Sequence, residues 1–295
     1  MNTKTAVLMI GLVVLSVGAG FGQTASDEKP MISNQDLFTK QIQIPESAEI
    51  IEINHHIGNV VVIGWEKPFI LLEGTKEVVA LDAGKARNAL ESIQMVAFTK
   101  VPNRLAIEYH GPGSSEDVDV EDHKVDITLQ VPRRMALDMD VRHGSVTVNN
   151  MANPVSIDHR YGDVEVEDID DKCQIRSREG NIKVRHIEKS LKLDTSEGIV
   201  EVEDVDGNLA IRHQEGEVTV KNITGRAIFN CYKAPMLVTN VKGRLEIDNR
   251  RADVECRDFY EGLDIYVNHG TVKAEPGHIL KNSYYCRVDD GDLIL

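Results

Sequence analysis

Aromatic residues are scarce in this sequence: they make up 5% of the 295 residues, and Trp65 is the only tryptophan. Stacking surfaces for bases or sugars are therefore few. Basic residues are also outnumbered, with 33 Lys and Arg against 48 Asp and Glu, which gives a formal charge of −15. No run of Lys and Arg offsets the repulsion between this charge and a phosphate backbone, which excludes nucleic acid as a partner.

Long apolar runs are absent except for one at the N-terminus. Residues 6–21 are uncharged and mostly apolar, follow Lys4, and end among small residues near Gly20 and Gly22. The run is shorter than the ~20 residues that cross a bilayer, and this arrangement is typical of a secretory signal peptide. We therefore expect a signal peptide over 1–22, a polar linker over 23–35, and export to the periplasm, the cell surface or the medium, with no stable membrane span after cleavage.

An 18-residue repeat dominates the rest of the chain. A Gly-x-Val-x-Val motif starts at Gly144, Gly162, Gly180, Gly198, Gly216, Ala234, Ala252 and Gly270, with Ala in place of Gly in two copies and Ile, Met, Cys or Ala in place of Val in some. When this Gly or Ala is numbered position 1, positions 3 to 5 and 12 to 14 alternate in polarity. Each repeat is therefore expected to hold two short strands.

Such a two-strand unit cannot cover its own apolar face, so the units must stack, with each strand parallel to its copy one coil away. The predicted fold is all-β: a single parallel β-solenoid (β-helix), right-handed by the crossover rule, and about 40 Å long at about 4.8 Å per coil. Charges at positions 4, 6 and 15 alternate in sign between coils, as in Asp158, Arg176 and Asp194. We expect these charge ladders to specify the register.

Small and Asx residues mark the predicted turns. The structural turn residues at position 1 are Gly144, Gly162, Gly180, Gly198, Gly216 and Gly270. Position 10 is often Gly, Asn or Asp, as at Gly207, and position 7 is mainly Asn or Asp. These residue types tolerate positive φ, so both positions are predicted to turn the chain.

The same period is visible before residue 142, where it is interrupted. Ile51 and Ile53 fit positions 12 and 14, and the segment from Gly58 to Phe69 and Leu71 fits a complete coil. Residues 82–95 predict a helix with an Asp N-cap, followed by strands over 96–99, 105–109 and 125–132. We interpret residues 36–141 as the N-terminal part of the solenoid, a cap with an inserted helix, and residues 142–295 as its regular part.

No motif predicts catalysis, a cofactor or a metal: a nucleophile elbow, a phosphate-binding loop and a zincin motif are all missing. His159 and His213 share position 16 but lie three coils apart, too far for one ion. His55 and His56 are adjacent in a strand, so their side chains point to opposite faces.

One acidic ladder and four cysteines leave alternatives open. Glu179, Glu197 and Glu215 share position 18, which fits a solvated turn edge or a weak Ca²⁺ site. The acidic segment 116–122 alternates with Val and fits a polar strand edge better than an EF-hand loop. Cys173, Cys231, Cys256 and Cys286 are expected to be unpaired thiols, although the extra residues near 280 leave a bridge between Cys256 and Cys286 open.

Taken together, these motifs resemble a known family. A Gly-Asn-Val-Val-Val coil, an inserted helix, a strand ending in Val131-Pro132 and serial Gly-x-Val-x-Val repeats are similar, over residues 36–295, to the bacterial putative-adhesin family of β-strand-repeat proteins. The resemblance implies a β-solenoid and an adhesive role. Ala234 and Ala252 depart from its pattern.

Two functions are compatible with this sequence. The first is an exported, non-enzymatic surface or envelope module that binds a protein, a glycan or a copy of itself; the second is a polysaccharide-active enzyme of the β-helix kind. Regular repeats leave little chain for the loops that form a catalytic cleft, which favours the first. The C-terminal coil at 291–295 is predicted to expose a strand edge for self-association, unless residues 278–282 fold over it.

Overall fold

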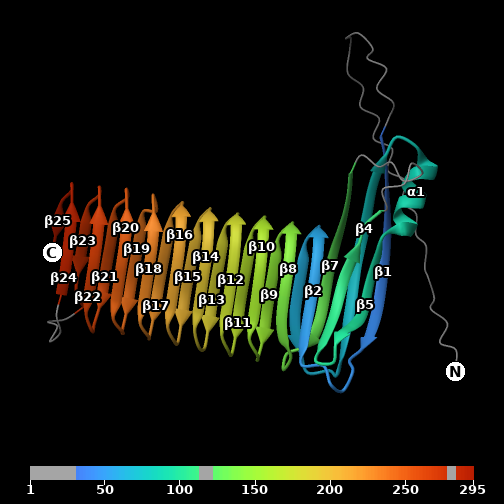
Figure 1. Cartoon of the computed structure of the whole chain (residues 1–295), viewed down its shortest axis with the longest axis horizontal. Coiled ribbons are helices and arrows are strands. Elements are labelled where there is room, and N and C mark those ends of the chain that lie inside the picture. Colours follow the sequence, from blue (N-terminus) through green and yellow to red (C-terminus); the bar gives the residue numbers. More distant parts are fainter. Residues whose placement is uncertain (1–30, 113–121, 278–283) are drawn as a thin grey trace, which may run out of the picture.

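The computed structural model describes residues 31–112, 122–277 and 284–295. They form a rod of stacked coils that ends in a thicker cap on the N-terminal side (Figure 1). The predicted signal peptide, the acidic segment up to 121 and residues 278–283 lie outside the described residues. Strand β1 (Ile32–Gln43) begins within the segment predicted as linker, so the cap starts earlier than expected.

Two long sheets make up the rod. In order along the first sheet, the strands are β1, β4 (Phe69–Ala80), β7 (Asp122–Pro132), β3 (Val60–Trp65), β9 (Val146–Met151), β11 (Val164–Ile169), β13 (Ile182–Ile187), β15 (Val200–Val205), β17 (Val218–Ile223), β19 (Met236–Val241), β21 (Val254–Phe259), β23 (Val272–Glu275) and β25 (Leu293–Ile294). The second sheet contains β24 (Tyr284–Asp289), β22 (Leu263–Asn268), β20 (Leu245–Arg250), β18 (Ala227–Tyr232), β16 (Leu209–Glu215), β14 (Leu191–Glu197), β12 (Cys173–Glu179), β10 (Val155–Tyr161), β8 (Ala136–His143), β2 (Ile50–Ile57), β6 (Arg104–His110) and β5 (Gln94–Val101).

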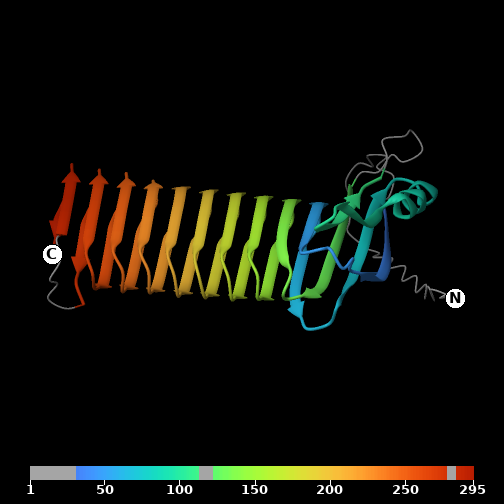
Figure 2. The same ribbon diagram turned by 60° about the horizontal axis from the view of Figure 1, so that its bottom comes forward.

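The strand register confirms the predicted solenoid and its 18-residue coil. Val164 of β11 pairs with Ile182 of β13 in the first sheet, and Cys173 of β12 pairs with Leu191 of β14 in the second, all in parallel. Each coil therefore contributes one strand to each sheet, and equal positions lie next to each other along the rod (Figure 2). The hand of the coil stays a prediction.

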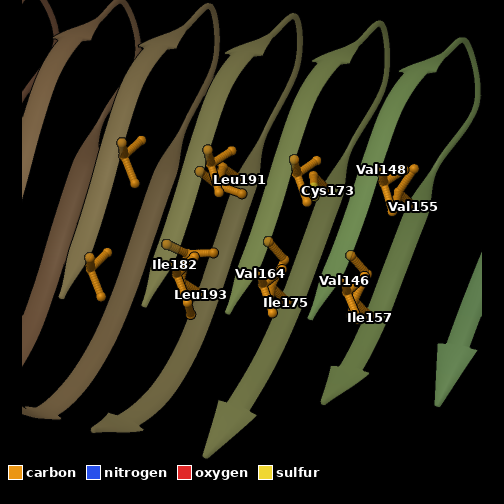
Figure 3. Packing of buried hydrophobic residues seen from close by; sticks show 14 of the residues in the cluster. Val146, Val148, Val155, Ile157, Val164, Cys173, Ile175, Ile182, Leu191 and Leu193 are labelled. Carbon is orange, nitrogen blue, oxygen red and sulfur yellow. The ribbon is translucent and has the colours of Figure 1, made fainter. Parts of the chain in front are cut away.

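The core lies between the two sheets, where the apolar side chains of both point toward each other (Figure 3). Positions 3, 5 and 8 of the first strand are buried, as Val164, Val166 and Ile169 show, and so are positions 12, 14 and 16 of the second. Simple alternation would place position 7 inward instead of position 8. The shift arises because position 7 has positive φ, for example 56° at Asp168.

Both predicted turn positions bend the chain, but position 7 has positive φ, whereas position 10 lies in the turn between the two strands without it. Seven residues at position 7 have φ between 51° and 62°: Asn150, Asp168, His186, Asp204, Asn222, Asn240 and Asp258. None of the glycines at position 10 (Gly207, Gly225 and Gly243) has a left-handed φ. They are small because the chain passes too close for a side chain: a β-carbon on Gly207 would lie 1.8 Å from the carbonyl oxygen of Lys189.

Position 1 requires glycine both for its positive φ and for the close approach of the neighbouring coil. Gly144, Gly162, Gly180, Gly198 and Gly216 have φ between 121° and 133°, a region that residues with a β-carbon rarely enter. A β-carbon on Gly180 would also lie 1.8 Å from the carbonyl oxygen of Gly162 in the preceding coil. These five predicted turn residues therefore form one continuous backbone-to-backbone ladder.

The turn changes its form toward the C-terminus, which explains the two alanines. From the coil after Gly216 onward, the residue before position 1 has the positive φ: Lys233, Arg251, His269 and Asp290, at 50° to 65°. Position 1 is then free of the left-handed conformation, so Ala234 and Ala252 can occupy it. Gly270, the sixth predicted turn residue, belongs to this second form and has no positive φ.

Apart from β1, the cap is an insertion after the first coil and does not precede it in the sequence. β2 and β3 stack directly on β8 and β9, with Ile51 beside Leu137 and Val60 beside Val146, so the chain leaves the stack after β3 and returns at β8. The excursion adds β4 and β7 to one sheet and the antiparallel pair β5 and β6 to the other. Helix α1 (Ala83–Ser92) lies against β4 and β1, and Asp82 caps it as predicted by accepting hydrogen bonds from the amides of Gly84 and Lys85.

The prediction that Phe69 and Leu71 complete a coil is wrong. Both lie in β4, which runs antiparallel to β1 and β7 in the first sheet. At the start of β4 the buried side chains are Ile70 and Leu72, one residue out of phase with the 18-residue frame. Because Phe69 and Leu71 alternate just as positions 12 and 14 do, spacing alone could not distinguish the two arrangements.

Candidate functional site

Buried polar side chains are concentrated at one coil position. Among the described residues, all but one of the buried polar side chains occupy position 16 of the second sheet: His55, His159, Ser177, Thr195, His213 and Asn249. The imidazole Nε2 of His159 lies 2.8 Å from the carbonyl oxygen of Gly144, and the amide of Asn249 donates to the equivalent carbonyl of Ala234 at 2.8 Å. A carbonyl oxygen only accepts, so Nε2 of His159 carries the hydrogen. The ladder satisfies inward-facing turn carbonyls and is structural.

Burial keeps the histidines of this ladder neutral. It lowers the pKa of His55 to about 4, and it lowers the pKa values of His159 and His213 below their usual range, because the charged imidazolium loses its hydration in the core. His55 also lies 2.8 Å from the carbonyl oxygen of Val125 through Nε2. His55 and His159 therefore hold backbone carbonyls in place, whereas neither ring nitrogen of His213 has a hydrogen-bond partner among the described residues.

A second ladder, exposed at position 7, contains a group that could hold a metal ion. Nδ1 of His186 lies 3.1 Å from Asp168 and 3.8 Å from Glu167, and Nε2 lies 3.3 Å from Asp204. A metal ion needs several His, Cys, Asp or Glu side chains close together. Within the described residues, one group of three has its ligand atoms within 4.8 Å of one another: Glu167, Asp168 and His186. Sequence reasoning missed them because they combine positions 6 and 7 of two coils.

The predicted acidic ladder stacks as expected but does not assemble a ligand set. Glu179 pairs with Glu197, and Glu197 with Glu215, in the second sheet. Lys233 of the next coil forms an ion pair with Glu215 at 3.3 Å. Over the described ranges, the three carboxylates are not among the groups of ligand atoms that lie within 4.8 Å of one another.

The most unusual surface is a ladder of arginines at position 17. Arg142, Arg160 and Arg178 follow one another on β8, β10 and β12 and are all exposed. Strand spacing puts their backbones about 4.8 Å apart, and like charges in adjacent strands repel each other. In the part of the chain that the structure describes, none of the three guanidinium groups forms an ion pair or a hydrogen bond. We call these three residues the arginine ladder.

A shallow, open depression of about 360 Å³ lies on this face. Arg160, Arg176 and Arg178 line it together with smaller polar residues, among them Ser177 and Ser196. Arg176 comes from position 15, so the depression gathers three cations from two coils. Two acidic residues of the same face, Asp158 and Asp194, flank them.

Charge and aromatic contacts extend this face toward the cap. His56 of β2 occupies position 17 next to Arg142; burial, and then the positive charge of Arg142, lowers the pKa of His56. At the neighbouring position 18, the rings of His143 and Tyr161 stack with centroids 4.9 Å apart. Sequence reasoning did not single out the arginine ladder, although the 18-residue frame places its members at one position.

The predicted charge ladders are aligned in register but form few ion pairs. Asp158 lies beside Arg176 and Arg176 beside Asp194, as predicted. Of the predicted partners at positions 4, 6 and 15, Arg185 and Glu203 form a salt bridge among the described residues, at 3.8 Å. The register therefore depends mainly on the buried side chains.

The four cysteines are free. Cys173, Cys231 and Cys256 are buried, and Cys286 is half-buried. Burial raises the pKa values of Cys173 and Cys231 to about 12 and that of Cys256 still further, so these thiols are unreactive at neutral pH. No bridge between Cys256 and Cys286 is present.

A comparison with protein families gives one match. Residues 102–231, which cover the end of the cap and the first regular coils, match the family described as Toastrack DUF4097. This part of the chain is similar to a Toastrack domain. This domain agrees with the strand-repeat family that the sequence motifs resemble, and no curated protein matches the chain.

The chain is also similar to several solved structures. A putative lipid binding protein from Parabacteroides distasonis is 11% identical, with 88% of this chain and 97% of that chain covered and a TM-score of 0.41. A putative adhesin from Bacteroides fragilis is 13% identical, with 88% and 96% covered and a TM-score of 0.29. A putative cell adhesion protein from Clostridium sporogenes is 10% identical, with 76% and 100% covered and a TM-score of 0.28.

Among the described residues, no helix has both the length and the apolar character needed to cross a bilayer. Helix α1 has 10 residues and lies against the cap strands.

Proposed function

We propose that this chain is an exported, non-enzymatic interaction module that binds a partner on the outer faces of its β-solenoid. The observation that carries the proposal is the open depression on the second sheet, where Arg160, Arg176 and Arg178 are exposed and form no salt bridge with any described residue. Charged groups on a flat, rigid sheet suit recognition of an extended partner.

The alternative, a polysaccharide-active enzyme, has less support. A second shallow groove of about 440 Å³ crosses β1, β3, β4 and β7 and contains the carboxylates of Glu73 and Asp126. Asp126 already accepts a hydrogen bond from the amide of Asn59 at 2.8 Å and pairs with Lys124 at 3.3 Å. Glycoside hydrolysis needs two opposed carboxyl groups in different protonation states, which an open groove with a neutralised carboxylate does not favour.

Export rests on the predicted signal peptide, and the compartment is part of the proposal. Cells that produce the whole chain should release or display a protein that lacks its first 20 to 22 residues, as N-terminal sequencing would show. An intact N-terminus on protein found in the cytoplasm would contradict export.

Self-association through the C-terminal coil remains a proposal of the same kind. β24 and β25 each have one neighbouring strand in the described part of the chain, and Tyr285, Leu293 and Ile294 are exposed there. Sedimentation of the protein and of a Leu293→Lys, Ile294→Lys variant would test it. A monomer throughout the micromolar range would reject it.

A glycan array combined with a pull-down tests the binding function itself. We expect a saturable ligand and no release of reducing ends from any polysaccharide that binds. Turnover of a bound polysaccharide, abolished by Asp126→Asn, would instead establish the enzyme.

A further inference from the structure

The arginine ladder differs from the other described arginine at position 17, which is neutralised. Arg250 also occupies position 17, and its Nε lies 3.6 Å from Asp248, two residues earlier on the same strand. Arg257 and Arg287 form similar short-range pairs with Glu255 and Asp289. An acidic residue two positions earlier can therefore neutralise an arginine at position 17, as Asp248 does for Arg250.

Two arginines of the ladder also have an aspartate two residues earlier on the same strand, but no salt bridge forms between them in the described structure. Asp140 precedes Arg142 by two residues, and Asp158 precedes Arg160, yet neither forms a salt bridge with its arginine in the described structure. Three guanidinium groups are thus left unpaired next to one another in a chain whose net charge is −15. Stacked like charges are unfavourable for folding, so an anionic ligand is the group that would compensate them.

The geometry selects an anion with a repeating charge. A guanidinium group binds carboxylate, sulfate or phosphate through two parallel hydrogen bonds, and the ladder repeats this donor about every 4.8 Å along the rod. A linear polysaccharide with an acidic group on most of its sugars repeats its charge at a comparable spacing. Laid along the rod across β8, β10 and β12, such a chain could meet all three arginines in turn.

Other features of the face favour a glycan over a more densely charged polyanion. Asp140, Asp158 and Asp194 lie on the same face and would repel the uninterrupted phosphates of a nucleic acid. Ser196, which lines the depression and is partly exposed, can exchange hydrogen bonds with sugar hydroxyls. Tyr161, exposed and stacked on His143, adds an aromatic surface at the edge of the ladder.

We propose that the arginine ladder binds a linear acidic polysaccharide whose carboxylate or sulfate groups contact Arg142, Arg160 and Arg178. This inference rests on the proposed function as a binding module and assigns its ligand class. The carboxylates of a polyuronate and the sulfate esters of a sulfated glucan share the chemistry that the guanidinium groups recognise.

Binding of the purified protein to immobilised polygalacturonate, dextran sulfate and neutral dextran tests the proposal, and the two charged polymers separate the carboxylate source from the sulfate source. We expect binding to one or both charged polymers and none to dextran. Raising NaCl from about 50 to about 200 mM should weaken binding, because salt screens the charges and reduces the entropy gained when counterions are released. Double-stranded DNA and polyglutamate serve as competitors, and stronger binding to either would overturn the assignment.

The matched variants are Arg142→Gln/Arg160→Gln/Arg178→Gln and, as a control at the same coil position, Arg250→Gln. The triple variant should lose at least about tenfold in affinity, whereas Arg250→Gln should stay within about twofold of the wild type. Thermal melting of both variants would test whether the fold is intact. We expect melting temperatures close to that of the wild type, because the substitutions remove surface charges that repel one another. Equal losses in the two variants would overturn the proposal.

The outcome also separates this inference from the proposed function. If neither charged polymer binds but the array or pull-down identifies a neutral glycan or a protein, the arginine ladder is not the acidic-polysaccharide site, and the chain remains a binding module. If no ligand is found and a polysaccharide is cleaved, the proposed function itself fails.

Discussion

Acid should destabilise this solenoid through its buried histidines, and His55 gives the clearest case. Its side chain is fully buried in β2, and burial lowers its pKa from 6.5 to about 4. Unfolding returns the imidazole to water, where its pKa is normal. Between pH 6.5 and 4 the unfolded chain therefore binds a proton that the folded chain does not, and stability falls as the pH falls through this window.

The magnitude follows from the pKa difference. A shift of this size corresponds to about 3 kcal/mol in full, of which about 2 kcal/mol has been lost at pH 5. His159 and His213 have pKa values lowered by the same cause and add to the loss in the same direction. Urea denaturation followed by circular dichroism at pH 7.5 and pH 5 would measure the change in the free energy of unfolding.

Asparagine is the natural replacement for His55, because Asn249 occupies the equivalent position in another coil. Asn249 donates a hydrogen bond to its turn carbonyl and does not titrate. His55→Asn should therefore reduce the loss of stability between pH 7.5 and pH 5 by about 2 kcal/mol, whatever its effect on stability at pH 7.5. His269→Asn is the control, because His269 is exposed and Asn tolerates its φ of 60°. If His55→Asn and wild type lose the same free energy on acidification, burial of this imidazole is not the cause.

Three further results are expected. Val200→Asp, which places an unpaired carboxylate in the core, should unfold the protein, whereas the exposed Arg212→Ala should cost under about 1 kcal/mol; similar urea midpoints would disprove the burial pattern. Gly180→Ala should cost at least about 2 kcal/mol, because its φ is 129° and the next turn is in contact. Ala252→Gly, at the same coil position but in the second turn form, should cost less than about 1 kcal/mol, and equal costs would contradict the two forms. Thiol labelling without reductant should modify Cys286 first and all four cysteines in denaturant; fewer than four would reveal a bridge.

The regular coils could be predicted from the sequence because their period is unbroken. A repeat of 18 residues with two alternating segments leaves one way to bury both apolar faces, and Val164 beside Ile182 follows directly. The helix was predictable from Asp82 and its apolar spacing. These features depend on local pattern or on neighbouring copies.

The cap was harder because its partners are distant in sequence and its strands run in both directions. Ile51 and Ile53 could be placed by their periodicity, but Phe69 and Leu71 have the same spacing in a strand that belongs to the other sheet. Gly207 shows a second limit: composition cannot distinguish a glycine needed for its φ from one needed for a close approach.

The arginine ladder was missed for a different reason. Arg142, Arg160 and Arg178 could be aligned in the 18-residue frame, but whether an arginine is neutralised depends on side-chain geometry. Arg250 and Asp248 have the same spacing in sequence as Arg160 and Asp158. The first pair forms a salt bridge in the described structure, and the second pair does not.

The detour of the chain through the cap also sets an order of events during protein synthesis. Val60 of β3 pairs with Val146 of β9, 86 residues later, so the first coil has no regular neighbour when it leaves the ribosome. At typical elongation rates this neighbour arrives roughly 4–17 s afterwards. Every later coil needs to wait for only 18 residues, so once β8 and β9 have emerged the rod can lengthen in step with translation, each finished coil serving as the template for the next.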